Sequence, residues 1–94
     1  MIGFDPDKDA ANIAKHGVSL RRAGDVVFEE ALIEADERFG YRESRWLAYG
    51  DLDGRLHVLV FTRRDDITRA ISLRKANHRE VRYVEGIRRV RSSS

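Results

Sequence analysis

The stretch RLHVLVFTRRDDITRAISLR, residues 55–74, predicts two β-strands joined by a tight turn. Residues 56–61 are apolar at both alternating positions apart from His57, which is typical of a central strand sheltered on both faces. Asp65 and Asp66 follow two arginines and mark the turn. Residues 67–74 then form the next strand, and the short connection predicts antiparallel pairing.

The segments before this hairpin predict more of the same sheet. ALIEAD at residues 31–36 and RWLAYG at 45–50 have the composition of short strands, and DLDG at 51–54 is a turn signal. MIGF at residues 1–4 can add a short edge strand. We therefore expect an antiparallel sheet of three to four strands.

Two N-terminal helices are predicted before the sheet. Asp5 can cap the first helix, Pro6 fits its first position, and Gly17 can end it in the left-handed conformation. Ser19 can cap a second helix that runs to about Phe28. The expected apolar stripe of the first helix consists of Ala10, Ile13 and Ala14, and that of the second consists of Leu20, Ala23, Val26 and Val27.

A C-terminal helix follows the last strand. Asn77 and Glu80 have the spacing of a capping box, and Val81, Val84 and Ile87 supply an apolar stripe. Residues 90–94 are expected to form a basic, frayed tail. The fold class is therefore α+β, one domain over residues 1–94, with helices packed on one face of the sheet.

Composition limits the possible functions. The 94 residues contain no cysteine, no signal peptide and no apolar run long enough to cross a membrane, so we expect a cytoplasmic protein without membrane contact. Residues 63–94 carry a net charge of +6 and residues 1–62 a net charge of −4. Nine of the ten cations in the later half are arginines, which suit phosphate or carboxylate partners.

Lys15 and His16 lie together at the predicted end of the first helix, just before Gly17. Metal-free RNA cleavage needs a base, an acid and cations around the phosphate, because the ribose 2′-OH can attack the adjacent phosphorus. His16 suits either proton transfer, and Lys15 can stabilise charge. The alternative is structural, because cations in the last turn compensate the helix dipole without any catalytic role.

The arginines and aromatic residues of the sheet suit RNA. Strand alternation without a bulge places Arg74 on the open face and Arg69 on the other, where it must reach past an edge or pair with a carboxylate. Trp46 can stack on an unpaired base or belong to the core. The three histidines lack ligand spacing, so neither a metal nor another cofactor is expected.

Motifs across residues 4–83 resemble the BrnT family of toxins. They are FDPDK at 4–8, N12, KHGVS at 15–19, A23, VF at 27–28, D36, ESR at 43–45, G50, T62, R64 and RAISLRKA at 69–76. The resemblance implies a RelE-like fold and a ribonuclease that arrests translation within a type II toxin–antitoxin module. It also implies a BrnA-like antitoxin whose DNA-binding part represses the operon, so that DNA is contacted only indirectly, and a possible higher-order assembly.

Seven polar residues occupy matching motif positions: Lys15, His16, Glu43, Arg45, Arg64, Arg69 and Arg74. We expect Lys15 or His16 to transfer protons, with Arg64 and Arg74 on the phosphate. The expected substrate-binding residues are Arg45, Arg69, Lys75 and Trp46. Phe4, Ala70 and Leu73 depart from the family pattern, and the last two changes compensate in volume.

A second function remains open at this point. The same basic sheet would serve a non-catalytic module that binds RNA or a partner and acts with a DNA-binding antitoxin in operon repression. A competing structural account pairs Arg69 with Glu43 or Asp36 to fix the strands. The two functions differ in one observable, whether bound RNA is recovered cut or intact.

Overall fold

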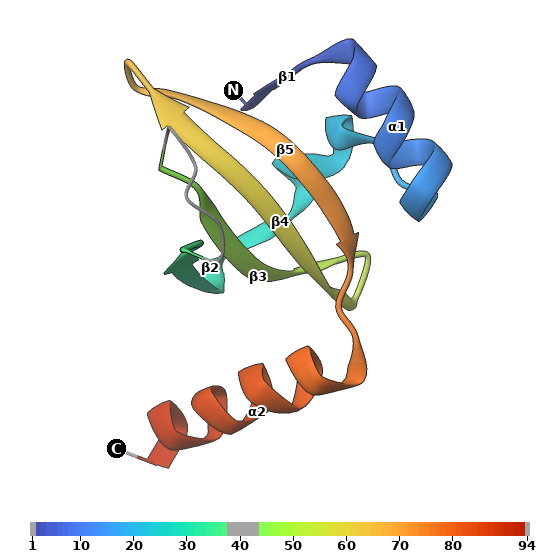
Figure 1. Cartoon of the computed structure of the whole chain (residues 1–94). Coiled ribbons are helices and arrows are strands. Elements are labelled where there is room, and N and C mark those ends of the chain that lie inside the picture. The colour runs from blue at the N-terminus through green and yellow to red at the C-terminus, as the bar shows by residue number, and fades with distance from the viewer. Residues whose placement is uncertain (1, 38–43, 94) are drawn as a thin grey trace.

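The computed structural model describes residues 2–37 and 44–93 (Figure 1). Its elements, in chain order, are β1 (Ile2–Phe4), α1 (Pro6–His16), the 3-10 helix η1 (Leu20–Asp25), β2 (Val27–Ala35), β3 (Trp46–Leu52), β4 (Arg55–Arg64), β5 (Ile67–Lys75) and α2 (His78–Ser93). The α+β class is confirmed.

The sheet has five strands in the order β1-β5-β4-β3-β2. The predicted three to four antiparallel strands form its main part, but β1 adds a fifth strand that pairs in parallel with β5, so the sheet is mixed. A strand of three residues can join in parallel here because α1 follows it directly and carries the chain away from the edge.

Both predicted tight turns are two-residue hairpin turns with left-handed backbone. Asp53 and Gly54 join β3 to β4 with φ of 53° and 77°, and Asp65 and Asp66 join β4 to β5 with φ of 53° and 65°. Positive φ at both central positions matches the twist of paired strands. The first turn sets the register of the β3–β4 hairpin and the second that of the long β4–β5 hairpin.

The N-terminal helix begins and ends as predicted. The Asp5 carboxylate accepts a hydrogen bond from the Asp7 N–H at 2.9 Å, and Gly17, with φ of 72°, donates its N–H to the Ile13 carbonyl at 2.8 Å. The predicted apolar packing of this helix is wrong, because Ile13 is 46 % exposed and Asn12 is the buried residue.

Asn12 joins α1 to the edge of β5 by hydrogen bonds. Its side-chain N–H donates to the carbonyls of Leu73 and Val18, each at 2.8 Å, and its oxygen accepts from the Leu73 N–H at 3.1 Å. The amide therefore pairs with Leu73 as a neighbouring strand would. Asn12 thus connects α1 to β5 through the hydrogen bonds of a buried amide.

The second predicted N-terminal helix is wrong in type and length, because the segment is the short 3-10 helix η1. Its buried residues Leu20 and Ala23, and Val26 at its end, recur every three residues, which is the 3-10 period. Ser19 caps it as expected, and the Asp9 carboxylate accepts from the Ser19 hydroxyl and the Leu20 N–H. The chain then enters β2 at Val27.

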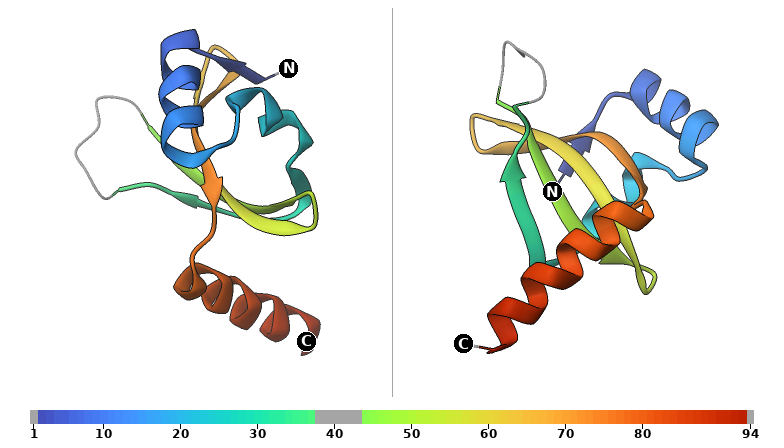
Figure 2. Two further views of the ribbon diagram at one scale, coloured as in Figure 1. Left: turned by 90° about the vertical axis from the view of Figure 1, so that its right-hand side faces the viewer. Right: turned by 60° about the horizontal axis from the view of Figure 1, so that its bottom comes forward.

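Helices lie on both faces of the sheet, not on one as predicted (Figure 2). The first hydrophobic cluster joins η1 to Ala48, Leu52, Leu59, Phe61, Ala70 and Leu73. The second cluster joins Val81 and Val84 of α2 to Leu47, Tyr49, Leu56, Val58 and Val60. Because β4 contributes to both clusters, it is the central strand that its sequence predicted.

The C-terminal helix begins with the predicted capping box. The Asn77 N–H donates to the Glu80 carboxylate and the Glu80 N–H donates to the Asn77 side chain, each at 2.9 Å. The helix continues to Ser93, so residues 90–93 are helical rather than the frayed tail expected there. Ser94 lies outside the described residues.

Candidate active-site groove

A β-bulge in β5 determines how the arginines are arranged. Phe61 of β4 lies opposite Ala70, but Val60 lies opposite Ser72, so Ile71 is an extra residue in β5. An extra residue reverses the alternation of side chains on one side of the bulge relative to the other. Bulges of this kind often occur next to active sites, where they redirect side chains.

The bulge brings Arg69 and Arg74 to the same face of the sheet. Arg69 lies opposite Thr62 and Arg74 lies opposite Val58, and these two β4 residues share a face because they are four positions apart. The expectation that the two arginines face opposite sides is therefore wrong. Sequence alternation alone does not reveal a bulge, because the bulge is defined by pairing with β4.

The end of α1 meets this arginine-bearing face. Lys15 and His16 line a pocket of about 250 Å³ together with Asp36, Arg45, Val60, Ile71, Ser72 and Arg74. Side chains from α1, β5 and the segment before β3 thus converge, although they are far apart in sequence. Among the predicted site residues, Lys15, His16, Arg45 and Arg74 are brought together.

One face of α1 lines an adjoining hollow of about 330 Å³. Its helix residues are Lys8, Ala11, Asn12, Lys15 and His16, and Arg45, Ile71 and Ser72 complete it. The helix residues are spaced i, i+3, i+4, i+7 and i+8, which is the spacing of one helix face. Lys8 was not among the predicted site residues, although its position two turns before Lys15 is a signal that the sequence contains.

The electrostatic environment of His16 favours its neutral form. Partial burial, followed by the charges of Lys15 and Arg74, lowers the pKa of His16 below its usual 6.5. Each of these effects disfavours the positively charged imidazolium. His16 is therefore mainly uncharged at neutral pH, which is the protonation state that a general base requires.

Hydrogen bonds to the backbone carbonyls of Ser44 and Arg45 fix the position of Arg45. The Asp36 N–H donates to the Arg45 carbonyl at 2.8 Å, and the Thr62 hydroxyl donates to the Ser44 carbonyl at 2.7 Å. Asp36 is itself buried and lines the pocket, a position that the sequence did not predict for it. Glu43, which precedes this segment, lies outside the described residues.

Arg74 forms a bidentate ion pair within the pocket region. Its Nη1 and Nη2 atoms lie 2.7 and 2.8 Å from the two Glu80 carboxylate oxygens. Glu80 also takes part in the capping box of α2, so the pair ties β5 to the start of that helix. Nη1 also lies 3.4 Å from the Lys75 carbonyl oxygen, so Arg74 is held where β5 meets α2.

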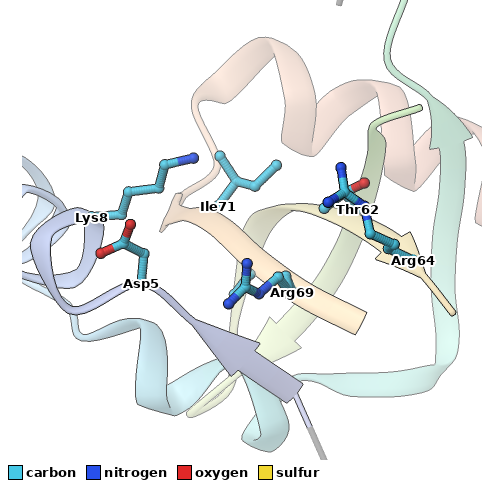
Figure 3. Close-up of a pocket in the computed structure, with 7 residues that line it drawn as sticks. Asp5, Lys8, Thr62, Arg64, Arg69 and Ile71 are labelled. Carbon is cyan, nitrogen blue, oxygen red and sulfur yellow. The ribbon is translucent and has the colours of Figure 1, made fainter. Parts of the chain in front are cut away.

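The other predicted site residues lie elsewhere. Arg64 and Arg69 line a separate pocket of about 170 Å³ with Asp5, Lys8, Thr62, Ala70 and Ile71 (Figure 3). Trp46 packs against the first hydrophobic cluster, on the opposite face of the sheet. Lys75 is exposed at the end of β5 and lines none of these three pockets.

The described part of the chain holds neither a candidate metal-binding cluster nor a candidate membrane span. Residues 2–37 and 44–93 contain no group of three histidine, cysteine, aspartate or glutamate side chains placed to hold a metal ion. No helix among these residues is long and apolar enough to span a membrane.

The chain is a small basic α+β protein in which Lys15, His16, Arg45 and Arg74 line one groove. Residues 4–80 match the model of a family described as "Ribonuclease toxin, BrnT, of type II toxin-antitoxin system". The chain therefore belongs to the BrnT family, a family of ribonuclease toxins whose module type implies an antitoxin partner. No curated protein matches the chain.

Proposed function

We propose that this chain is a metal-independent endoribonuclease that cuts RNA in the groove between the end of α1 and β5. The observation that supports this most directly is the convergence of Lys15, His16, Arg45 and Arg74 on one pocket. These residues supply a neutral imidazole and at least three cations, which are the groups that cleavage by the ribose 2′-OH requires.

In the proposed reaction, His16 removes the proton of the 2′-OH. The 2′ oxygen forms a bond to phosphorus while the bond from phosphorus to the 5′ oxygen breaks. Lys15 donates a proton to the leaving 5′ oxygen, and Arg45 and Arg74 bind the phosphate oxygens as negative charge increases on them. The products are a 2′,3′-cyclic phosphate and a 5′-hydroxyl end.

The form of the groove supports a polymeric substrate. Its three adjoining hollows, of about 170, 250 and 330 Å³, lie at or below the lower end of the range of roughly 300–1,000 Å³ for small-molecule pockets. A shallow basic surface suits the backbone of single-stranded RNA, which is bound along its length by cations.

The test is cleavage of a synthetic RNA oligonucleotide by purified protein in the presence of EDTA. Wild type is expected to give fragments that end in a 2′,3′-cyclic phosphate, and to leave the all-deoxy version intact. His16→Gln is expected to lower kcat by about 10²–10⁴-fold. Arg82→Gln, a change of an exposed arginine on α2, is the matched control and leaves kcat unchanged.

Two results would contradict this proposal. Fragments with a 3′-hydroxyl end would exclude attack by the 2′-OH. RNA that binds tightly to folded protein but is recovered intact would favour the alternative of a non-catalytic binding module.

We further propose that RNA cleavage arrests translation and that a BrnA-like antitoxin neutralises the chain, with DNA contacted only through that antitoxin. An acidic segment with an apolar stripe would complement the cations of the groove. Size-exclusion chromatography of the two chains mixed at equal concentration is expected to give one complex. The complex is expected to leave intact an mRNA that the free chain cleaves.

A further inference from the structure

The pocket that contains Arg69 collects cations from three elements. Lys8 comes from the first turns of α1, Arg64 from the end of β4 and Arg69 from β5 (Figure 3). The Lys8 side chain extends toward Ile71, and Arg69 lies between Asp5 and Arg64 in this view. Hereafter we call this site, lined by Lys8, Thr62, Arg64 and Arg69, the Arg69 pocket.

The Arg69 pocket has an excess of positive charge. Among the residues that the structure describes, Asp5 is the only acidic one that lines it, and the Asp5 carboxylate already caps α1 through the Asp7 N–H. Within residues 2–37 and 44–93, neither Lys8 nor Arg69 forms an ion pair with a carboxylate. Lys8 and Arg69, two cations without a carboxylate partner in these ranges, beside one carboxylate that already caps a helix, favour an anionic ligand.

The Arg69 pocket is continuous with the proposed cleavage site. Ile71 lines all three hollows, and Lys8 lines both the Arg69 pocket and the hollow beside α1. Arg69 and Arg74 lie opposite Thr62 and Val58, which are four residues apart on β4, or roughly 13 Å. Arg69 lines the Arg69 pocket, whereas Arg74 lines the cleavage pocket and is paired with Glu80, so the two arginines belong to different hollows.

We propose that the Arg69 pocket is a second phosphate subsite, which binds a phosphate of a nucleotide flanking the bond that is cut. This inference rests on the proposed function, because it requires that the same RNA strand occupies the cleavage site. It replaces the expectation that Arg64 and Arg74 bind the same phosphate. Arginine suits this role because its planar group binds two phosphate oxygens at once.

The subsite makes the length of the RNA important. A strand that reaches both pockets gains the phosphate contacts of Lys8, Arg64 and Arg69, whereas a dinucleotide that fills only the cleavage site gains none. The contacts lie away from the reacting phosphorus, so they strengthen substrate binding without changing the chemical step. We therefore expect the Arg69 pocket to lower KM for long substrates only.

The experiment measures kcat and KM on an oligonucleotide that spans both pockets and on the dinucleotide that contains the cleaved bond. Arg69→Ala and Lys8→Ala are each expected to raise KM for the long RNA by about tenfold with kcat unchanged, and to leave the dinucleotide unaffected. Arg63→Ala is the matched control, because Arg63 adjoins Arg64 on β4 but does not line the pocket.

Neutral methylphosphonate linkages identify the phosphate that the pocket binds. Replacing the correct flanking phosphate is expected to raise KM for wild type about tenfold and to have no further effect on Arg69→Ala. Equal KM values for wild type and Arg69→Ala on the long RNA would overturn the subsite. A fall in kcat with unchanged KM would do so as well, because it would place Arg69 in the chemical step.

Binding measurements separate this inference from the proposed function. Fluorescence anisotropy with the uncleavable deoxy oligonucleotide needs no catalysis, and Arg69→Ala is expected to weaken binding and to reduce the salt slope by about 0.7. If wild type does not cleave RNA but Arg69→Ala still weakens oligonucleotide binding, the proposed ribonuclease activity is overturned and the proposed phosphate subsite is retained. Unchanged affinity for the oligonucleotide, with weaker binding of an acidic antitoxin peptide, would overturn the phosphate site.

Discussion

His16 is partly buried and has two neighbouring cations, Lys15 and Arg74. Its pKa is lowered first by burial and then by Lys15 and Arg74. Because a cation disfavours imidazolium, removing either charge must raise this pKa toward 6.5. A base that acts in its neutral form loses activity as the pH falls through its pKa, so the lowered value extends activity to more acidic conditions.

We predict that NMR titration places the pKa of His16 below 6.5 in the wild type and higher in Lys15→Gln and Arg74→Gln. The signal of His16 is assigned with His16→Gln, since the chain has only two other histidines. Lys8→Gln is the control, because Lys8 is two helical turns from Lys15 and should leave the value unchanged. A wild-type midpoint above 6.5 would contradict the prediction.

Asn12 is the residue on which the placement of α1 depends. Its buried side chain makes three hydrogen bonds to backbone groups of Val18 and Leu73. Asn12→Ala leaves these buried groups without partners, so we predict a loss of about 2–3 kcal/mol in the free energy of unfolding. Urea denaturation measures the change.

The control for Asn12 lies next to it on the helix. Ile13→Ala removes an exposed side chain and is expected to change stability by no more than about 0.5 kcal/mol. Similar losses for both variants would show that α1 is held by apolar packing and not by the amide.

For single residues, the sequence predicts which side chains are chemically suited to the site better than it predicts where those side chains lie in the fold. The cap and stop signals locate Lys15 and His16 correctly at the end of a helix, because these signals act over a few neighbouring residues. The site also contains Asp36, whose burial follows from contacts with distant segments. Trp46 was predicted to bind RNA but packs against the first hydrophobic cluster. The sequence could not decide between these positions, because an aromatic side chain on a strand fits a core and an RNA surface equally well.

The turn between β4 and β5 is an element whose sequence does not match its geometry. Both Asp65 and Asp66 have positive φ, and such turns favour asparagine followed by glycine. Replacing the pair by Asn–Gly is therefore predicted to raise the free energy of unfolding by about 0.5–1 kcal/mol, because glycine adopts this conformation without strain.

The gain in the free energy of unfolding should appear as a higher midpoint of urea denaturation, while the dependence of this free energy on urea concentration stays unchanged. Asp65→Asn alone, which leaves a non-glycine residue at the second position, is the control and should gain less. A lower midpoint for the Asn–Gly variant would show that the aspartate side chains stabilise the hairpin.

Elements were predicted well where one segment determines its own structure. The strands and turns of residues 46–75 follow from local alternation and turn residues, and they are confirmed. The bulge at Ile71, the parallel pairing of β1 and the position of α2 depend on which segments meet in space. These features set the geometry of the groove, so the groove was the least predictable part of the fold.

At the scale of the whole molecule, the unequal distribution of charge predicts strong dependence on salt. Binding of single-stranded RNA releases counterions, and the slope of log K against log salt is about −0.7 for each phosphate contacted. If the groove contacts four phosphates, raising NaCl from 50 to 200 mM is predicted to weaken binding by about fiftyfold. Anisotropy titrations with the deoxy oligonucleotide measure the slope, and a slope near zero would contradict a phosphate-directed groove.

The separation of the core into two clusters has a consequence for the motion of α2. The helix is held to the sheet by Val81 and Val84, by contacts of Tyr83 with Glu34 and Tyr49, and by the pair between Arg74 and Glu80. None of these belongs to the cluster around η1, so α2 can open as a separate cooperative unit while that cluster stays folded. Amide hydrogens of α2 should then exchange with solvent sooner than those of β4. Each opening separates Arg74 from the Glu80 carboxylate and makes the pocket beside the end of α1 more positive.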